Sequence, residues 1–175
     1  MVSVNNIPEI LKKNVEWHIE QIAVQINHSD KVRGRAKTGY YKVAILLEAA
    51  VVEALAHHIL KIKIQGGASI PNGPWECYEC YTLPQIYQQG VDKLAICKRR
   101  ILVFRLTNKT DFAKVNKICK DLNIFSNSFF KKIERIRTMR NRIHLQGLDQ
   151  IDRSYTMKQV DSVGYVINKL IDKLP

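Results

Sequence analysis

One segment of this 175-residue chain concentrates side chains that can handle protons and phosphates. Residues 129–147 read FFKKIERIRTMRNRIHLQG, and the spacing of the apolar residues predicts a helix. At about 100° per residue, one face gathers the apolar side chains of Phe129, Ile133, Ile136, Met139 and Ile143. Arg137, Arg140 and His144 fall on or beside that face, with Asn141 close to them. Burying an unpaired charge costs on the order of several kcal/mol, so this placement requires a reason.

The arginine and histidine side chains could converge on one point above this helix. Along its axis, Arg140 and His144 are about 6 Å apart, and Arg137 and His144 are about 10 Å apart. Histidine can transfer a proton near neutral pH. Arginine binds phosphate oxygens and stabilises the negative charge that develops on them. Together they are the minimum set for cleaving a phosphodiester without a metal. The alternative is structural: an arginine paired with Glu48 or Glu53, and a histidine satisfied in the core.

The string RTMRNRIHLQG, near the end of a penultimate helix, resembles the HEPN superfamily (higher eukaryotes and prokaryotes nucleotide-binding). The signature of that family is an arginine, four to six residues, and then a histidine, all on one helix of an α-helical bundle. Arg137 fits this spacing, with six residues before His144. Arg140 is followed by the polar Asn141, as is typical of the family, but only three residues separate it from the histidine. Both arginines are therefore candidates.

This resemblance implies a ribonuclease that needs no metal and no other cofactor. Two protomers would share one cleft, in which His144 helps the ribose 2′-hydroxyl attack its own phosphate and an arginine stabilises the transition state. The products would carry 2′,3′-cyclic phosphate and 5′-hydroxyl ends. Prokaryotic members often act as toxins or antiphage effectors beside a nucleotidyltransferase antitoxin, whereas other members only bind their ligands.

Positive charge is concentrated in one stretch of the chain. Residues 98–142 carry 14 Lys+Arg and three acids, which is +11 of the formal net charge of +12. A localised basic surface attracts polyanions, of which nucleic acid is the commonest. The residues predicted to bind RNA are Arg99, Arg100, Lys131, Arg135 and Arg142. Residues 111–142 also fit a helix-turn-helix DNA binder, but Arg140 and His144 would then be exposed to the groove rather than near the apolar face.

Residues 39–64 predict a helix at the centre of the bundle. Between Val43 and Ala56 only Glu48 and Glu53 interrupt its apolar residues. Each carboxylate would either form a structural salt bridge or orient Arg137 or Arg140. Glu48 is the better candidate for the orienting role.

The remaining patterns complete an all-α bundle of about five helices in a single domain, residues 1–175. The other expected helices are 8–29, a short helix from the cap Thr110 to Leu122, a long one from Ser126 or Ser128 to Gly147, and a last one from the Thr156–Gln159 capping box to Leu174. Residues 66–107 form a β or irregular insertion. Within it, 66–84 is expected to be a loop folded onto the bundle, and 92–107 is either a helix or a hairpin with its turn near Lys98–Arg100.

Other kinds of site find little support in the sequence. Cys77 and Cys80 could be half of a zinc site, but Cys97 and Cys119 lack the spacing of a second half, so buried thiols are expected. The adjacent His57 and His58 diverge on a helix and are expected to be structural or exposed. The chain has no Gly-rich phosphate loop, HExxH or GxSxG motif. Without a signal-peptide pattern or a run of about 18 apolar residues, a cytoplasmic protein is expected.

Overall fold

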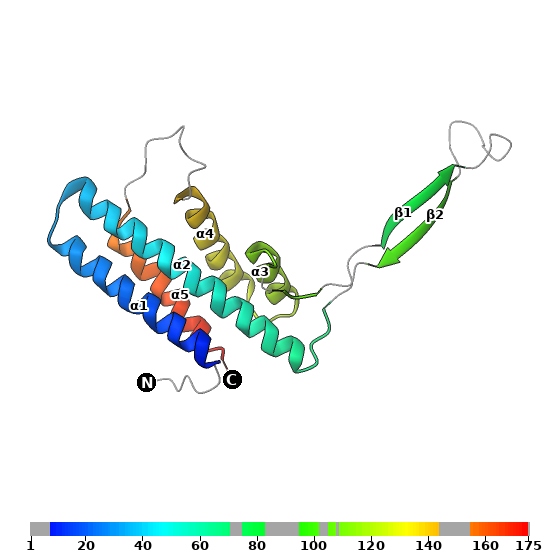
Figure 1. The fold of residues 1–175 in the computed structure, drawn as a ribbon, viewed down its shortest axis with the longest axis horizontal. Helices are drawn as coiled ribbons and strands as arrows, with labels where there is room; N and C mark the ends of the chain where they lie inside the picture. The colour runs from blue at the N-terminus through cyan, green and yellow to red at the C-terminus, as the bar shows by residue number, and fades with distance from the viewer. Residues whose placement is uncertain are drawn as a thin grey trace. The chain divides into compact units, whose positions relative to one another are not determined.

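The computed structural model describes residues 8–70, 75–82, 95–101, 105–107, 109–143 and 155–174. The elements in chain order are α1 (Glu9–Asp30), α2 (Gly34–Gln65), β1 (Trp75–Thr82), β2 (Ala95–Ile101), α3 (Phe112–Asp121), α4 (Asn127–Ile143) and α5 (Met157–Ile171). The predicted all-α bundle of five helices is confirmed (Figure 1). The chain divides into two compact units, a helical one (Met1–Ala68 with Lys109–Pro175) and the insertion (Ser69–Asn108). That residues 1–175 form a single domain stays a prediction.

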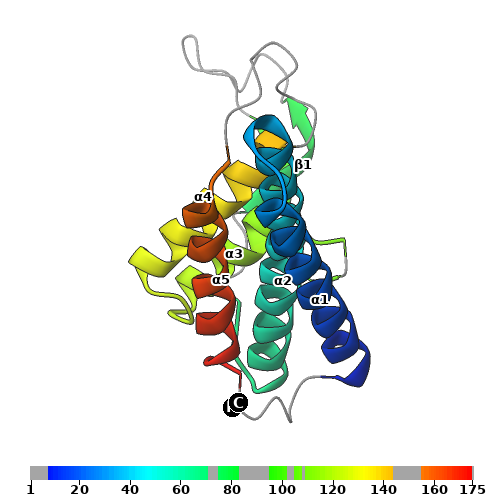
Figure 2. The same ribbon diagram turned by 90° about the vertical axis from the view of Figure 1, so that its left-hand side faces the viewer.

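Helix α2 is the centre of the helical unit, as its almost wholly apolar sequence predicted. It packs against α1, α3, α4 and α5 (Figure 1), and it passes between α1 and α5 in the turned view (Figure 2). Its fully buried side chains include Ala44, Ile45, Val52, Leu55, Ala56 and Leu60. By length and composition alone, α2 is also the one helix in the described part of the chain that could cross a membrane. The four helices packed around it account for this apolar character.

A hydrophobic cluster holds the carboxyl end of α4 in place. Ile143 packs there with residues from α1, α2 and the start of α5, namely Ile22, Tyr41, Ala44, Ile45, Tyr155 and Val160. Burial of aliphatic and aromatic side chains of this size stabilises a fold by roughly 1.5–3 kcal/mol each. The last turn of α4, which carries Arg140, is therefore fixed against the bundle.

Polar side chains set the ends of the last three helices. Asp111, rather than the expected Thr110, caps α3 by accepting a hydrogen bond from the Ala113 amide at 3.1 Å. Asn123 ends the helix in a left-handed conformation, with φ of 55°. Ser126 Oγ accepts from the Phe129 amide at the start of α4, and the predicted capping box opens α5. The predicted end of α4 at residue 147 lies outside the described residues.

The insertion contains an antiparallel hairpin of β1 and β2. Its register runs from Trp75 opposite Ile101 to Thr82 opposite Ala95, with an irregularity between Tyr78 and Cys80. The turn predicted near residues 98–100 is wrong, because these residues lie within β2. The first strand comes instead from part of the segment predicted as a loop, where three aromatic residues favour a strand despite the flanking glycines and prolines. Folding of residues 66–84 onto the bundle stays a prediction.

Candidate functional site

Helix α4 carries the candidate site and packs against α2 and α3. Its buried face consists of Phe129, Ile133, Ile136 and Ile143. Arg137 and Arg140 are half-buried at the edge of that face, whereas Lys131, Arg135, Asn141 and Arg142 are exposed. The predicted division of the helix into inner and outer polar residues is confirmed for the two arginines and for Lys131, Arg135 and Arg142, whereas Asn141, which was expected close to the inner group, is exposed.

Arg140 is held by a carboxylate of the central helix. Its Nη1 donates to Glu53 Oε2 at 2.5 Å, and both side chains are half-buried. A guanidinium has five N–H donors, so this ion pair orients the group and leaves other donors for an anion. The contact links the last turn of α4 to the middle of α2.

Glu48, which was expected to orient Arg137 or Arg140, lies elsewhere. It lies five positions before Glu53, which places the two carboxylates about 140° apart on α2. Glu48 faces α5: a Cβ on Gly164 would lie 3.4 Å from its Oε1, and the charge of Asp161 acts on it. Glu53 therefore makes the contact that was expected of Glu48, because α4 covers one face of α2 and α5 covers another.

Glu48 is itself an unusual group. It is only 4% exposed, and its Oε2 has no hydrogen-bond partner within the described structure. Burial, reinforced by the negative charge of Asp161, raises the pKa of this carboxyl from 4.5 to about 8. The folded protein therefore keeps Glu48 protonated at neutral pH, whereas the unfolded chain releases that proton.

Glu48→Gln is expected to stabilise the protein at high pH. In the wild type, the contribution of Glu48 is fully present below pH 4.5 and is lost as the pH rises through about 8. The loss is on the order of a few kcal/mol. Urea unfolding across this range should show the decline in the wild type and a flatter profile in the variant, which becomes the more stable protein above neutral pH. Glu16→Gln, at an exposed position of α1, is the control that should keep the wild-type slope. An unchanged slope in Glu48→Gln would contradict the assignment.

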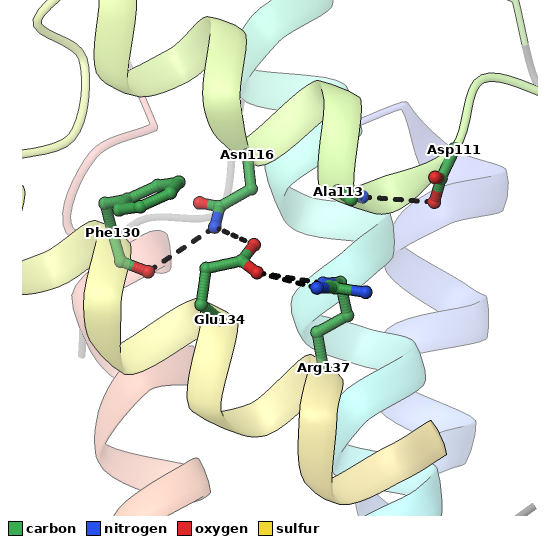
Figure 3. A network of polar contacts seen from close by, with 6 residues as sticks. All are labelled: Asp111, Ala113, Asn116, Phe130, Glu134 and Arg137. Carbon is green, nitrogen blue, oxygen red and sulfur yellow. Dashed lines mark hydrogen bonds and ion pairs between the residues drawn. The ribbon is translucent and has the colours of Figure 1, made fainter.

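Arg137 belongs to a second network, which Figure 3 shows between α3 and α4. Its Nε and Nη2 donate to Glu134 Oε2 at 3.0 and 2.9 Å. Glu134 Oε1 in turn accepts from Asn116 Nδ2 at 2.7 Å, and the same amide group lies 3.4 Å from the Phe130 carbonyl oxygen. Because Asn116 is fully buried, α3 fixes Glu134 and Glu134 fixes Arg137.

Sequence reasoning missed Asn116 and Glu134. The available signal was Asn116, a polar residue within the buried stripe of α3 beside Val115 and Cys119. Buried amides are almost always hydrogen-bonded, so a buried Asn116 predicts a polar partner on the neighbouring helix. Its Oδ1 has no hydrogen-bond partner in the part of the chain that the structure describes.

Several predicted site residues are not brought together by the described structure. His144 lies outside the described residues, so its convergence with the arginines stays a prediction. Arg99 and Arg100 lie in β2, opposite Cys77 and Glu76 in the register of the hairpin. They belong to the insertion rather than to the helical unit that carries α4.

Cys119 and His57 occupy structural positions, and the register of the hairpin places two further cysteines. Cys119 is buried in α3, and burial raises the pKa of its thiol to about 12, which makes it unreactive. Cys80 and Cys97 are opposite each other in the hairpin. His57 Nε2 lies 3.0 Å from the Thr110 carbonyl oxygen. Across the described ranges, no three His, Cys, Asp or Glu side chains form a group that could hold a metal ion.

Comparison with protein-family models, curated proteins and solved structures finds no match to this chain. The chemistry of the site therefore has to be argued from its own residues. The described part offers two guanidinium groups, fixed by carboxylates from different elements, on the most basic helix of the bundle. Such groups can bind a phosphate and stabilise negative charge on it.

Proposed function

We propose that this protein is a metal-independent endoribonuclease of the HEPN type. The observation that carries the proposal is the paired fixation of Arg137 and Arg140 by Glu134 and Glu53, at the end of α4 that leads into His144. Preorganised cations are what an enzyme needs where negative charge develops in a transition state. The sequence resemblance supplies the reaction type, and the ion pairs support it.

In this proposal, His144 accepts the proton of a ribose 2′-hydroxyl as its oxygen attacks the adjacent phosphate. The P–O5′ bond breaks, and the proton is returned to the departing 5′-oxygen. Arg140 stabilises the charge on the phosphate oxygens, and Arg137 contributes a second positive charge. Asn141 is exposed one residue beyond Arg140 and would hydrogen-bond the RNA. The reaction needs no cofactor, and its products carry 2′,3′-cyclic phosphate and 5′-hydroxyl ends.

The outer face of α4 would hold the RNA backbone. Lys131, Arg135 and Arg142 are exposed there, and Lys117 is exposed on the neighbouring α3. Arg99 and Arg100 of β2 would add contacts to a longer RNA. This separation places binding cations outside and catalytic cations at the edge of the buried face.

The proposal extends to partners and setting. A homodimer would supply the opposite wall of the cleft and a second set of groups. The resemblance further suggests a toxin or antiphage effector with a nucleotidyltransferase-type antitoxin, and the sequence pattern suggests a cytoplasmic protein without membrane contact. A nucleotidyltransferase gene beside the one that encodes this chain would favour the toxin role, and a phage-defence locus would favour the effector role.

The second candidate function is a non-catalytic module that binds nucleic acid, nucleotide or protein. The observation in its favour is that both inner arginines already have carboxylate partners, as structural arginines do. A helix-turn-helix DNA binder fits the exposed cations of α4, but it gives no role to the half-buried Arg140.

Cleavage assays on matched single-stranded RNA and DNA test the proposal. In excess EDTA, the purified protein should cut the RNA and leave the DNA intact, because DNA lacks the 2′-hydroxyl nucleophile. Binding of RNA without any cleavage would favour the non-catalytic module. Tighter binding of duplex DNA than of RNA would favour the helix-turn-helix alternative.

Lys131→Ala and Arg135→Ala are expected to weaken RNA binding without changing the chemical step. Each removes one exposed cation, so the slope of log K against log salt concentration should fall by about 0.7 for a single strand. Titrations at several salt concentrations measure the slope, and single-turnover rates at saturating RNA measure the chemistry. A loss of saturated rate in either variant would place the outer face in the catalytic machinery and contradict the assignment.

A further inference from the structure

Helix α1 has an apolar stripe that faces away from the bundle. Ile10, Trp17 and Val24 are 77%, 55% and 41% exposed and recur every seven residues. The buried residues of the same helix, Val15 and Ile22, lie about 140–160° around it from Trp17. Among the described elements, α1 packs against α2 alone, and it lies at one side of the helical unit in Figure 2. No described element reaches the stripe.

The stripe and its flanks are self-complementary about Trp17. Ile10 and Val24 lie seven residues before and after it. One flank of the stripe carries Lys13, four residues before Trp17, and Glu20, three residues after it. The other flank carries Asn14, three residues before Trp17, and Gln21, four residues after it. A two-fold axis at Trp17 would therefore bring an apolar residue to an apolar one, a cation to an anion and an amide to an amide.

We infer that α1 is a self-association surface that pairs antiparallel with α1 of a second copy. In an antiparallel pair, equal flanks of the two helices meet, so Lys13 lies beside Glu20 of the partner subunit, twice. A parallel pair would instead bring unequal flanks together, so that Lys13 would lie beside Asn14 of the partner subunit and Glu20 beside Gln21 of the partner subunit, without an ion pair. Opposite charges on neighbouring helices favour the orientation that pairs them, and of the two arrangements only the antiparallel one pairs Lys13 with Glu20. Two-fold contacts of this isologous kind are the commonest in homo-oligomers.

The charge of the chain also favours this helix as the contact. Residues 9–30 carry four acids and two lysines, which is −2, so the rest of the chain carries 12 + 2 = +14. Two strongly basic copies repel each other least where they approach through their acidic helices. Within the described residues, Lys13 pairs with Glu9, at 3.7 Å between two largely exposed side chains. Such a surface ion pair is weak, so Lys13 can exchange it for the partner.

This interface is distinct from the cleft of the proposed function and does not depend on it. Three apolar residues per helix bury less than the roughly 1,600 Å² of a standard interface, so we expect micromolar affinity. If the helices that carry the catalytic site also dimerise, the α1 contact joins two such dimers. In either case, loss of the α1 contact halves the mass of the assembly.

Sedimentation equilibrium over about 1 µM to about 1 mM tests the inference. The wild type should show a concentration-dependent doubling of mass, and Trp17→Asp should abolish it. Ile19→Asp is the matched control, since Ile19 is an exposed apolar residue about 160° around α1 from Trp17. Circular dichroism checks that each variant is folded. No doubling in the wild type, or unchanged doubling in Trp17→Asp, would overturn the inference.

A charge exchange tests the antiparallel register without touching the apolar stripe. Lys13→Glu should weaken the doubling by about tenfold, because it places two acids opposite each other at two sites. Adding Glu20→Lys restores opposite charges, so the double variant should return to within about threefold of the wild-type constant. A double variant as weak as Lys13→Glu would rule out the proposed pairing.

Discussion

Replacing His144 with alanine is expected to slow RNA cleavage by about 10²-fold or more, the scale for losing a positioned acid–base group. In the proposed mechanism, His144 alone moves the proton of the 2′-hydroxyl. Its removal should lower the single-turnover rate at saturating RNA, while RNA affinity stays close to that of the wild type. His28→Ala is a matched control, because His28 is exposed on α1 and stacks on Tyr40 of α2, outside the proposed site on α4.

The affinity measurement makes this result informative. A rate that falls with unchanged binding assigns His144 to the chemical step. A variant that cleaves as fast as the wild type would show that another group moves the proton and that the catalytic assignment is wrong.

Arg140→Ala is expected to lower the cleavage rate by about 10²–10³-fold, as for loss of one oxyanion-stabilising donor. Arg140 is one turn before His144 and uses a single donor nitrogen, Nη1, on Glu53, whereas Arg137 uses both Nε and Nη2 on Glu134. Arg140 therefore keeps more N–H donors for a phosphate, and Arg137→Ala should lower the cleavage rate less than Arg140→Ala does. Arg140→Lys should recover little of the rate, because lysine keeps the charge but lacks the planar set of donors that binds two phosphate oxygens at once.

Glu53→Gln separates positioning from charge at the same site. It leaves Arg140 in place but weakens the ion pair that orients it, so we expect a loss of about tenfold in rate. Arg135→Ala, on the exposed face of α4, is the control that should retain the saturated rate. A larger loss in Arg137→Ala than in Arg140→Ala would instead make Arg137 the operative arginine, in agreement with its six-residue spacing from His144.

The parts of the fold that the sequence predicted are those set by local patterns. The apolar run between residues 43 and 56 predicted a central helix, because a helix that is apolar on every side can be stable only when other helices surround it. The Thr156–Gln159 pair predicted the start of α5, because a capping box satisfies amides within one turn. The start of α3 was missed by one residue because Thr110 and Asp111 are both good caps, and only the backbone decides between them.

The predictions that were wrong or incomplete concern contacts between different helices and strands. Glu48 and Glu53 are equivalent in sequence, and their roles differ only because α5 covers one face of α2 and α4 covers another. Asn116 gained its role from Glu134 on a different helix, which no spacing within α3 can show. In the insertion, aromatic residues outweighed glycine and proline because two strands pair, and pairing partners are not local.

The chemical ends of the RNA products test the central claim most directly. After digestion of a single-stranded RNA in excess EDTA, mass spectrometry should show 2′,3′-cyclic phosphate and 5′-hydroxyl ends from the wild type, and no such products above background from His144→Ala. These ends form only when the neighbouring 2′-hydroxyl is the nucleophile. Products with 3′-hydroxyl and 5′-phosphate ends would mean that water attacks instead, and would contradict the account.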